Sequence, residues 1–410
     1  MVNTVNSNPA PYDSPVNAKA HVIRSDREAI NIAQQLSEVF AKDSAVRDRD
    51  RQLPHAELEK LSQSGLLGIT IPRKYGGAYV SNVTLADVTK ILSEGDSNLG
   101  QIPQNHFYMV EALRLNGTEK QQQHYFQQVL AGKRLGNAFC EVGTKTPTAF
   151  KTRVTRTNSG YVLNGKKFYS TGALFAHIVP VVALDDDDHQ VIVFVDRHAE
   201  GLTIIDDWSG MGQRTTASGT TILDNIKVED WQIVRHYLAF EQQTTMGAIA
   251  QILHTAIDVG IARAAHRDTL HFVRHHSRAW IDSNVEQAYE EPFLIHSVGE
   301  MTIRLHAAEA LLKRAGVAID RALELGTEVS AIEASVAVAE AKALADDAAI
   351  FITNKLFELS GTRSTLEQFN YSRHWRNVRT HTLHDPVCWK YHGVGNYYLN
   401  GVNPPRHGAF

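Results

Sequence analysis

The spacing of apolar residues along the 410-residue chain changes twice, and this change constrains the fold more than any other sequence feature. From about residue 25 to 132, and again from about 237 to 392, apolar residues recur with the period of one face of an α-helix. Between about 135 and 231 they occur in short β-branched runs separated by turn residues, which is typical of strands. The sequence therefore predicts a mainly α-helical protein with a central β-domain.

Individual residues predict where several helices begin and end. Ser25 and Glu28 form the pattern of a capping box, and Pro54 is placed to open a second helix that Gly65 closes. A third helix is expected over residues 118–130. In the C-terminal half, three Ala-, Leu- and Ile-rich segments predict long helices of an antiparallel bundle, namely residues 246–275, 292–326 and 330–359.

The central segment contains the strand signals. Residues 161–165 predict a strand that enters an Asn-Gly hairpin turn, and residues 167–169 would start the return strand. Residues 178–184 and 191–195 are β-branched runs on either side of the acidic run 185–188. That run could be a cation site, but a solvated hairpin tip is the favoured interpretation. Short strands at this spacing predict a small antiparallel barrel or sandwich.

These boundaries divide the chain into a flexible N-terminal arm (1–24), an N-terminal helical domain (25–134), a β-barrel domain (135–232) and a C-terminal helical bundle with a tail (233–410). The formal charge of −4 provides no basic field for nucleic acid or an anionic membrane surface. No apolar run is long enough to span a bilayer, and the arm lacks the apolar segment of a signal peptide. Two cysteines suit a reducing compartment, so we expect a cytoplasmic protein.

Short universal motifs are absent from the sequence. It has no GxGxxG after a strand, no GxxxxGK[ST], no HExxH and no GxSxG. A Rossmann dinucleotide site, P-loop phosphoryl transfer, zincin chemistry and esterase chemistry therefore lack support. The chemistry must come from residues that are spread along the chain.

Three segments of the central domain resemble the acyl-CoA dehydrogenase superfamily. Residues 136–141 (GNAFCE) are similar to the flavin-edge strand of that family, and residues 161–173 (YVLNGKKFYSTGA) to the strand pair whose aromatic side chain covers the flavin. Residues 210–228 (GMGQRTTASGTTILDNIKV) are similar to the segment that closes the β-domain. The resemblance covers about residues 25–392. It implies an N-terminal helical domain, a small antiparallel β-barrel and a C-terminal helical bundle.

The chain departs from the dehydrogenases where they commonly have their catalytic Glu. The matching stretch contains His381-Thr-Leu-His384-Asp385-Pro386, which places Asp385 at the Glu position. Asp is one methylene shorter than Glu, and Pro386 biases Asp385 away from the helical conformation. Asp385 is therefore poorly placed to remove a proton from a bound substrate. The segment instead resembles the flavin-dependent monooxygenase branch of the superfamily, which includes dibenzothiophene monooxygenase and the sulfur-acquisition oxidoreductases.

This resemblance implies a two-component monooxygenase. Such enzymes receive FMNH2 from a separate NAD(P)H flavin reductase, react it with O2, and insert one oxygen atom into an organosulfur substrate through a C4a-hydroperoxyflavin. Bundles of this family are usually homotetramers. FAD is a less favoured cofactor, because residues 360–364 (SGTRS) replace a Gly-rich turn that receives cofactor from the neighbouring subunit. The alternatives are an FAD-dependent acyl-CoA dehydrogenase or related flavin oxidase with Asp385 as base, and a catalytically silent paralogue.

The same resemblance assigns candidate site residues by position. The catalytic polar residues would be His106, Asn137, Ser170, His381 and His384. The cofactor-binding residues would be Asn137, Cys140, Tyr169, Ser170, Arg278, Trp280 and Arg363. The apolar wall of the substrate pocket would be Phe107, Tyr108, Phe139 and Trp389. Imidazole, amide and hydroxyl donors can stabilise a developing flavin alkoxide without acting as strong bases.

Each assignment has a simpler structural interpretation. His381 and His384 could be packed core histidines, and Arg278 and Arg363 could form surface ion pairs. The two histidines are also spaced to share one helical face, as metal ligands do. Because no matched carboxylate or cysteine pair accompanies them, we expect no metal site.

Overall fold

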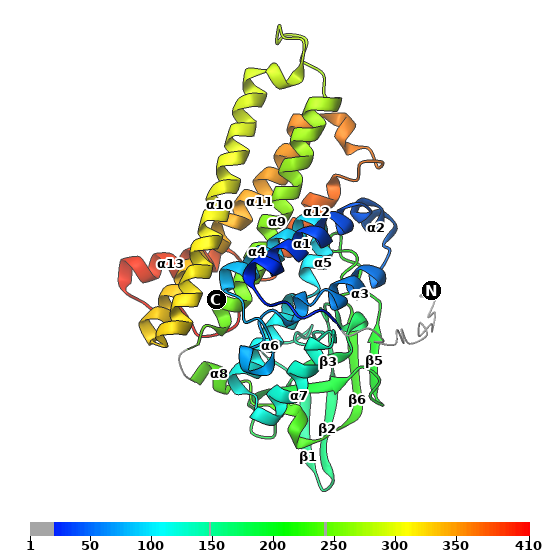
Figure 1. Cartoon of the computed structure of the whole chain (residues 1–410), viewed down its shortest axis with the longest axis vertical. Helices are drawn as coiled ribbons and strands as arrows, with labels where there is room; N and C mark the ends of the chain where they lie inside the picture. Colours follow the sequence, from blue (N-terminus) through cyan, green and yellow to red (C-terminus); the bar gives the residue numbers. More distant parts are fainter. Residues whose placement is uncertain (1–19, 147–148, 242–243) are drawn as a thin grey trace.

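The computed structural model describes residues 20–146, 149–241 and 244–410. In Figure 1 the long helices of the C-terminal half extend from one end of the molecule, the β-sheet lies at the other end, and the N-terminal helices lie between them. The predicted order of helices, strands and helices is confirmed. Residues 1–19 of the predicted arm lie outside the described residues. Within the three described ranges, no helix is both long enough and apolar enough to cross a membrane.

Helical turns dominate the N-terminal region, and polar caps set where several of them start. The helices are α1 (Asp26–Ala41), α2 (Ser44–Asp50), α3 (His55–Gln63), α4 (Asn82–Gly95), α5 (Ser97–Gln101), α6 (Gln104–Asn116) and α7 (Glu119–Leu130). Ser25 caps α1 by accepting from the backbone N–H of Glu28, whereas the Glu28 carboxylate binds the backbone N–H of Arg24 instead of completing the capping box. Thr118 and Gln121 form a complete capping box at α7. The helix starts predicted near Ser25, Pro54 and Thr118 are confirmed.

One seven-stranded sheet forms the central region. Its strands are β1 (Arg153–Thr157), β2 (Gly160–Lys167), β3 (Ile178–Leu184), β4 (Gln190–Asp196), β5 (Leu202–Ile205), β6 (Thr220–Val228) and β7 (Ile233–Val234), in the order β5-β6-β2-β1-β3-β4-β7. All neighbouring strands are antiparallel except β1 and β3, which are parallel and share the single register pair Arg153–Leu184. Because the connection after β2 crosses β1 to reach β3, β3 runs in the same direction as β1.

The hairpin predicted at Asn164-Gly165 is wrong. Strand β2 continues through both residues and pairs with β6, with a register shift between Leu163 and Gly165. Gly165 has a φ of 157°, and a Cβ there would lie 2.3 Å from Thr152 Oγ1, so this glycine permits a bulge and a close approach. The turn lies instead at residues 158–159, between β1 and β2. The return strand predicted over 167–169 is also absent from the described chain, since β2 ends at Lys167.

The C-terminal region contains the long helices of the bundle. They are α9 (Met246–His276), α10 (Pro292–Leu325) and α11 (Glu328–Ser360), preceded by the short α8 (Leu238–Glu241) and followed by α12 (Ser372–His381) and α13 (Cys388–Asn400). The three predicted long helices are confirmed to within a few residues. Helix α9 packs against α4, α10 and α11, and its first half is buried on all sides. Polar side chains on that half are therefore held inside the protein.

Candidate active site

Three histidines and one glutamine meet between helices α5, α9 and α12. His381 ends α12, and His384 lies in the turn that follows it. The His381 Nε2 atom lies 3.1 Å from His254 Nδ1 of α9 and 3.1 Å from Gln101 Oε1 of α5. The Nε2 atom of His384 lies 3.3 Å from Gln101 Nε2. We call this group, together with the buried charged residues Asp258, Lys342 and Asp346, the helical half of the candidate site.

A buried ionic network of Asp258, Lys342 and Asp346 binds His381 on the Nδ1 side of its ring. His381 Nδ1 donates to Asp258 Oδ1 at 2.6 Å, and Lys342 Nζ binds Asp258 Oδ2 at 2.9 Å and also pairs with Asp346. These side chains are 0–4% exposed. Burial opposes the charged form of Lys342, but Asp258 and Asp346 outweigh it and raise the pKa of this amine. Burial and the nearby Asp258 raise the pKa of Asp346, so the Asp346 carboxyl holds a proton more readily than an exposed Asp does.

Hydrogen bonds fix the tautomers of His381 and His384. Since the carboxylate of Asp258 only accepts, His381 carries its proton on Nδ1. His384 Nδ1 lies 2.8 Å from the carbonyl oxygen of His381 and must donate to it. Burial lowers the pKa of His381 and His254 well below 6.5 and also lowers the pKa of His384. With Nδ1 as the donor in each ring, Nε2 is the atom that carries the lone pair of the neutral imidazole.

Asp385, the residue at the position of the dehydrogenase Glu, is tied to a lysine. Lys390 Nζ lies 2.9 Å from Asp385 Oδ2 and also donates to the backbone oxygen of Ala409. Lys390 is 1% exposed, so this ion pair is largely shielded from water. A carboxylate held in this way is a weak candidate for a base.

The β-domain supplies the second half of the candidate site. Asn137 Nδ2 donates to the backbone oxygen of Tyr169 at 3.3 Å, whereas Asn137 Oδ1 and Ser170 Oγ are buried without a partner among the described residues. Tyr169 has a φ of 57° and its ring is 49% exposed. Gly172 brings this turn so close to the residue after Gln101 that a Cβ would lie 3.2 Å from the Ile102 oxygen. The two halves therefore adjoin, and we call this part the β-domain half.

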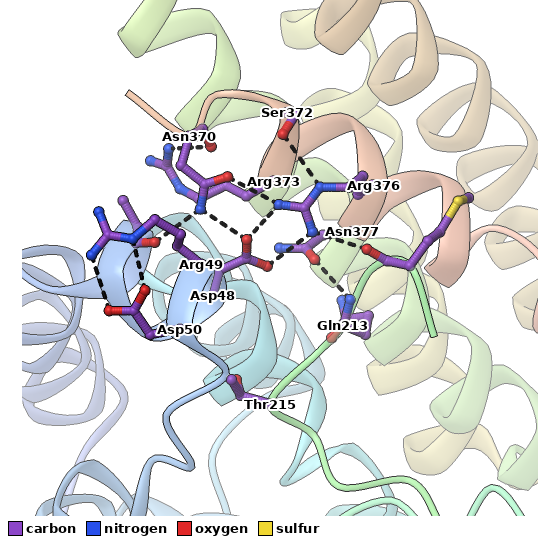
Figure 2. Close-up of polar contacts among 12 residues, drawn as sticks. Asp48, Arg49, Asp50, Gln213, Thr215, Asn370, Ser372, Arg373, Arg376 and Asn377 are labelled. Carbon is purple, nitrogen blue, oxygen red and sulfur yellow. Dashed lines mark hydrogen bonds and ion pairs between the residues drawn. The ribbon is translucent and has the colours of Figure 1, made fainter. Parts of the chain in front are cut away.

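Residues 210–219 fasten the β-domain half to the helices, as Figure 2 shows. The backbone N–H of Gln213 donates to Asn377 Oδ1 at 2.7 Å. The Asn377 amide in turn donates to Ser97 Oγ at 2.8 Å. Arg376 of α12 donates to the Met211 oxygen and pairs with Asp48 of α2. The buried side-chain amide of Gln213 has no partner for either of its polar atoms within the described structure.

The predicted pocket wall is assembled in part. Phe107 and Tyr108 are buried on α6, and the Tyr108 and Phe139 rings meet at a centroid distance of 6.3 Å. The Tyr108 hydroxyl lies 3.0 Å from His236 Nε2. Trp389 is 62% exposed and packs on His392, so it is not brought to the other members of the wall.

Cys140 lies beside the β-domain half. Its backbone oxygen accepts from the N–H of Phe168, and burial raises the pKa of its thiol. Cys140 is half-buried, and its raised pKa favours the thiol over the thiolate.

Other predicted site residues are not brought to these halves. His106 is 1% exposed; its Nε2 binds the Leu67 oxygen at 2.9 Å and its Nδ1 accepts from the N–H of Leu135 at 3.0 Å. Both ring nitrogens are used by backbone, so His106 joins α6 to the chain entering the β-domain and has none left for a substrate. The resemblance assigns His106 a catalytic role, and a packed histidine is considered only for His381 and His384.

The predicted phosphate-binding residues lie outside both halves. Arg278 and Trp280 follow α9 at the far end of the long helices (Figure 1), and both are exposed. Arg363 follows α11 and is also exposed. Within the ranges that the structure covers, no ion pair is formed by Arg278 or Arg363.

Sequence reasoning missed the residues that support His381. His254 and Asp258 lie four positions apart on α9, and Lys342 and Asp346 lie four positions apart on α11. The available signal was a pair of polar residues on one face of an otherwise apolar helix. Gln101 and Gln213 gave no comparable signal.

The β-domain half has the donor set that a flavin ring requires. The edge of the ring presents both N–H and carbonyl groups, which need acceptors and donors. The buried atoms without a partner include both kinds: Asn137 Oδ1, Ser170 Oγ, Thr215 Oγ1 and the Gln213 amide. The residues present therefore fit a bound flavin.

Sequence profiles of three acyl-CoA dehydrogenase domains match the chain. The N-terminal domain matches residues 29–133, the middle domain 141–226 and the C-terminal domain 252–388. Dibenzothiophene monooxygenase from Rhodococcus erythropolis is 33% identical over 397 residues, covering 93% of this chain and 95% of the relative. The probable FMNH2-dependent monooxygenase SfnC from Pseudomonas putida is 29% identical, covering 92% of this chain and 96% of the relative.

Two solved structures are similar over nearly the whole chain. FMN-bound TdsC from Paenibacillus sp. A11-2 has a TM-score of 0.89 and 28% identity, covering 93% of this chain and 100% of that one. Methanesulfinate monooxygenase MsuC from Pseudomonas fluorescens has a TM-score of 0.86 and 29% identity, covering 93% and 99% of the two chains.

Proposed function

Because the chain belongs to the acyl-CoA dehydrogenase superfamily, within its flavin-dependent monooxygenase branch, we propose that it is a two-component FMNH2-dependent monooxygenase that oxidises a small organosulfur compound. Membership makes it an oxidoreductase. The proposal adds the sulfur substrate, FMN rather than FAD, and delivery of FMNH2 by a separate NAD(P)H flavin reductase. The names of the relatives support the sulfur substrate and FMN, and the FMNH2 dependence in the name of SfnC is the reason for proposing a separate reductase.

One observation supports oxygenation over dehydrogenation most strongly. Where the dehydrogenases commonly have a free Glu, this chain has a neutral histidine pair, and its Asp385 is paired with Lys390. Removal of a substrate proton needs a carboxylate that can accept it. Oxygen transfer needs groups that bind and orient neutral and weakly charged atoms in a site that excludes water.

Each half of the site has its own task in this proposal. A bound reduced flavin would supply the chemistry that activates O2 for transfer of one oxygen atom to the substrate. Asn137, Ser170 and Tyr169 hold the flavin against the β-domain. His384 accepts a hydrogen bond at Nε2 from the group that lies over the flavin, and His381, oriented by Asp258, sets the position of the His384 turn. Tyr108 and Phe139 form the apolar wall on which the substrate rests.

Assembly completes the cofactor site in this account. Arg278, Trp280 and Arg363 are exposed and lie outside both halves, so we propose that they bind the flavin phosphate of a neighbouring subunit in a homotetramer.

We also propose that the chain is divided into four units, at residues 1–24, 25–134, 135–232 and 233–410.

A product screen tests the function. The full-length protein is incubated with FMN, NADH, a generic flavin reductase and air, across sulfides, thiophenes, sulfoxides and sulfones. A substrate that gains one oxygen atom, only when the reductase is present, would support the proposal. Stopped-flow mixing of protein, FMNH2 and O2 should show C4a-hydroperoxyflavin absorbance. Absence of that signal and of any oxygenated product, together with bleaching of tightly bound FAD by an acyl-CoA, would replace the proposal with a dehydrogenase.

A further inference from the structure

Three histidine side chains converge beside the proposed catalytic site. The candidate ligand atoms of His254, His381 and His384 all lie within 4.8 Å of one another, and their ring centroids are 4.8–5.2 Å apart. No metal site was expected at His381 and His384, because the sequence shows no matched carboxylate or cysteine pair beside them. Packing of α9 against α12 adds His254, which is 127 residues away from His381 in the chain.

We propose that His254, His381 and His384 form a binding site for one divalent transition-metal ion of the Zn²⁺ class, and that the bound ion inhibits the enzyme. Binding of the ion follows from the geometry of the three rings alone. The inhibition rests on the function proposed above.

The hydrogen bonds around the rings leave lone pairs pointing into the space between them. His384 donates from Nδ1 to the His381 oxygen, and His381 donates from Nδ1 to Asp258, so both Nε2 atoms carry lone pairs. A neutral imidazole whose other nitrogen donates to a carboxylate or backbone carbonyl is the usual form of a metal-bound histidine. The chain thus holds two ligands in that form before any metal arrives.

The amide of Gln101 cannot satisfy both lone pairs. Its Oε1 atom faces His381 Nε2 at 3.1 Å, and its Nε2 atom faces His384 Nε2 at 3.3 Å. If the amide were turned over, its oxygen would face His384 instead. In either orientation one acceptor faces another without a hydrogen between them, which is unfavourable inside a protein. A cation at this point would be bound by the imidazole nitrogens and by the amide oxygen together.

The dimensions and the donor set select the kind of ion. Zinc–imidazole bonds of about 2.0–2.1 Å in a tetrahedron place the nitrogens roughly 3.4 Å apart. His254 Nδ1 and His381 Nε2 are already 3.1 Å apart, so small ring rotations are sufficient. Three nitrogen ligands favour Zn²⁺, Co²⁺, Ni²⁺ or Cu²⁺ over Mg²⁺ and Ca²⁺, which prefer oxygen.

The residues around the three histidines hold one ligand in place and leave a route for a metal ion to enter. Asp258 binds the back of His381, and Lys342 binds Asp258, so the ligand is held in place by a second layer. The residue His384 is exposed, which provides an entry route for the ion. An ion in this place would occupy the Nε2 lone pair that His384 offers to the reaction, and this is the cause of the expected inhibition.

Cobalt binding to the flavin-free full-length protein tests the site without any turnover. Titration with Co²⁺ should give the intense visible bands of tetrahedral cobalt at one ion per chain, and Zn²⁺ should displace them. His384→Phe, at a position open to solvent, and His254→Phe should each lose the bands. Asp258→Asn should weaken the affinity ~10–100-fold, as loss of a supporting residue does.

The matched control is His271→Phe, which removes an exposed histidine of α9 that packs on His275, away from the site. It should bind cobalt as the unaltered protein does. Absence of tetrahedral bands, or bands that persist in both His384→Phe and His254→Phe, would overturn the site. In turnover assays, Zn²⁺ should inhibit oxygenation reversibly with EDTA, and full activity of the zinc-loaded protein would overturn the inhibition. If the bands appear but no substrate is ever oxygenated, the proposed function fails and the metal site stands.

Discussion

The helical half of the candidate site consists mainly of buried polar groups that bind one another, with Asp346 Oδ2 as an exception, whereas the β-domain half contains several buried polar atoms that have no partner in the described structure. Asp258, Lys342 and His381 form a continuous network at 2.6–2.9 Å. Asn137 Oδ1 and Ser170 Oγ have no such contacts. Since a buried polar atom without a partner is unfavourable, these atoms indicate that the β-domain half is built to receive a ligand.

The largest expected effect comes from breaking the network of the helical half. Lys342→Met would leave Asp258 and Asp346 buried without their cation, and should lower the free energy of unfolding by about 3–5 kcal/mol in urea denaturation. The control is Lys355→Met, because Lys355 pairs with Glu358, which is 61% exposed. That variant should lose less than ~1 kcal/mol. Equal losses in the two variants would show that the network does not stabilise the helical half.

The next effect is on catalysis. His384→Phe changes an exposed histidine, so the fold should persist while oxygenated product per FMNH2 supplied falls by about 10²–10³-fold. His392→Phe changes another exposed histidine, which packs on Trp389, and should keep the activity. An unchanged product yield in the His384 variant would mean that the protein is a catalytically silent relative or that its site lies elsewhere.

Two serine substitutions sharpen the comparison between the halves. Ser170→Ala deletes a hydroxyl without a partner, so the flavin-free protein should keep or slightly increase its stability, while FMN affinity falls by roughly tenfold. Ser97→Ala deletes the acceptor of the Asn377 amide, and should cost about 1–3 kcal/mol because that amide is then buried and unpaired. Calorimetry and FMN titration measure both quantities. A Ser170 variant that is destabilised without loss of FMN affinity would remove the β-domain half as a flavin site.

The smallest expected effect is a change in the pH dependence of stability. Burial lowers the pKa of His106 from its ordinary 6.5 to about 4. The unfolded chain therefore binds one more proton than the folded chain between these values, and stability falls as the pH decreases from about 6.5 to about 4, by up to ~1.4 kcal/mol per pH unit. His106→Gln should flatten this slope by about one proton. An unchanged slope would show that His106 is not held neutral by the fold.

The sequence predicts the parts of the fold that depend on local rules. The start of α7 follows from the Thr118 capping box, and the lengths of α9, α10 and α11 follow from their apolar periodicity. The Asn164-Gly165 dipeptide shows where local rules fail. Its strong turn preference is overridden by pairing of β2 with β6, which uses Gly165 for a bulge.

In the helical half, the sequence predicted only those site residues that are close to one another in the chain. His381 and His384 are three positions apart, and their proximity follows from the chain itself. His254 and Lys342 reach them through helix packing, which one sequence does not reveal. His106 illustrates the converse, since its position in the resemblance indicated catalysis, while the contacts of its two nitrogens with Leu67 and Leu135 show a structural role.

Turnover under heavy-isotope dioxygen tests the central claim most directly. The full-length protein, FMN, a flavin reductase and NADH are incubated under ¹⁸O2 with an organosulfur substrate that the screen has identified. The molecular mass of the product is then measured by mass spectrometry. The account predicts that each oxygenation adds one ¹⁸O atom, derived from dioxygen and not from water. A product without heavy oxygen, formed while an acyl-CoA is desaturated by the same protein, would contradict it.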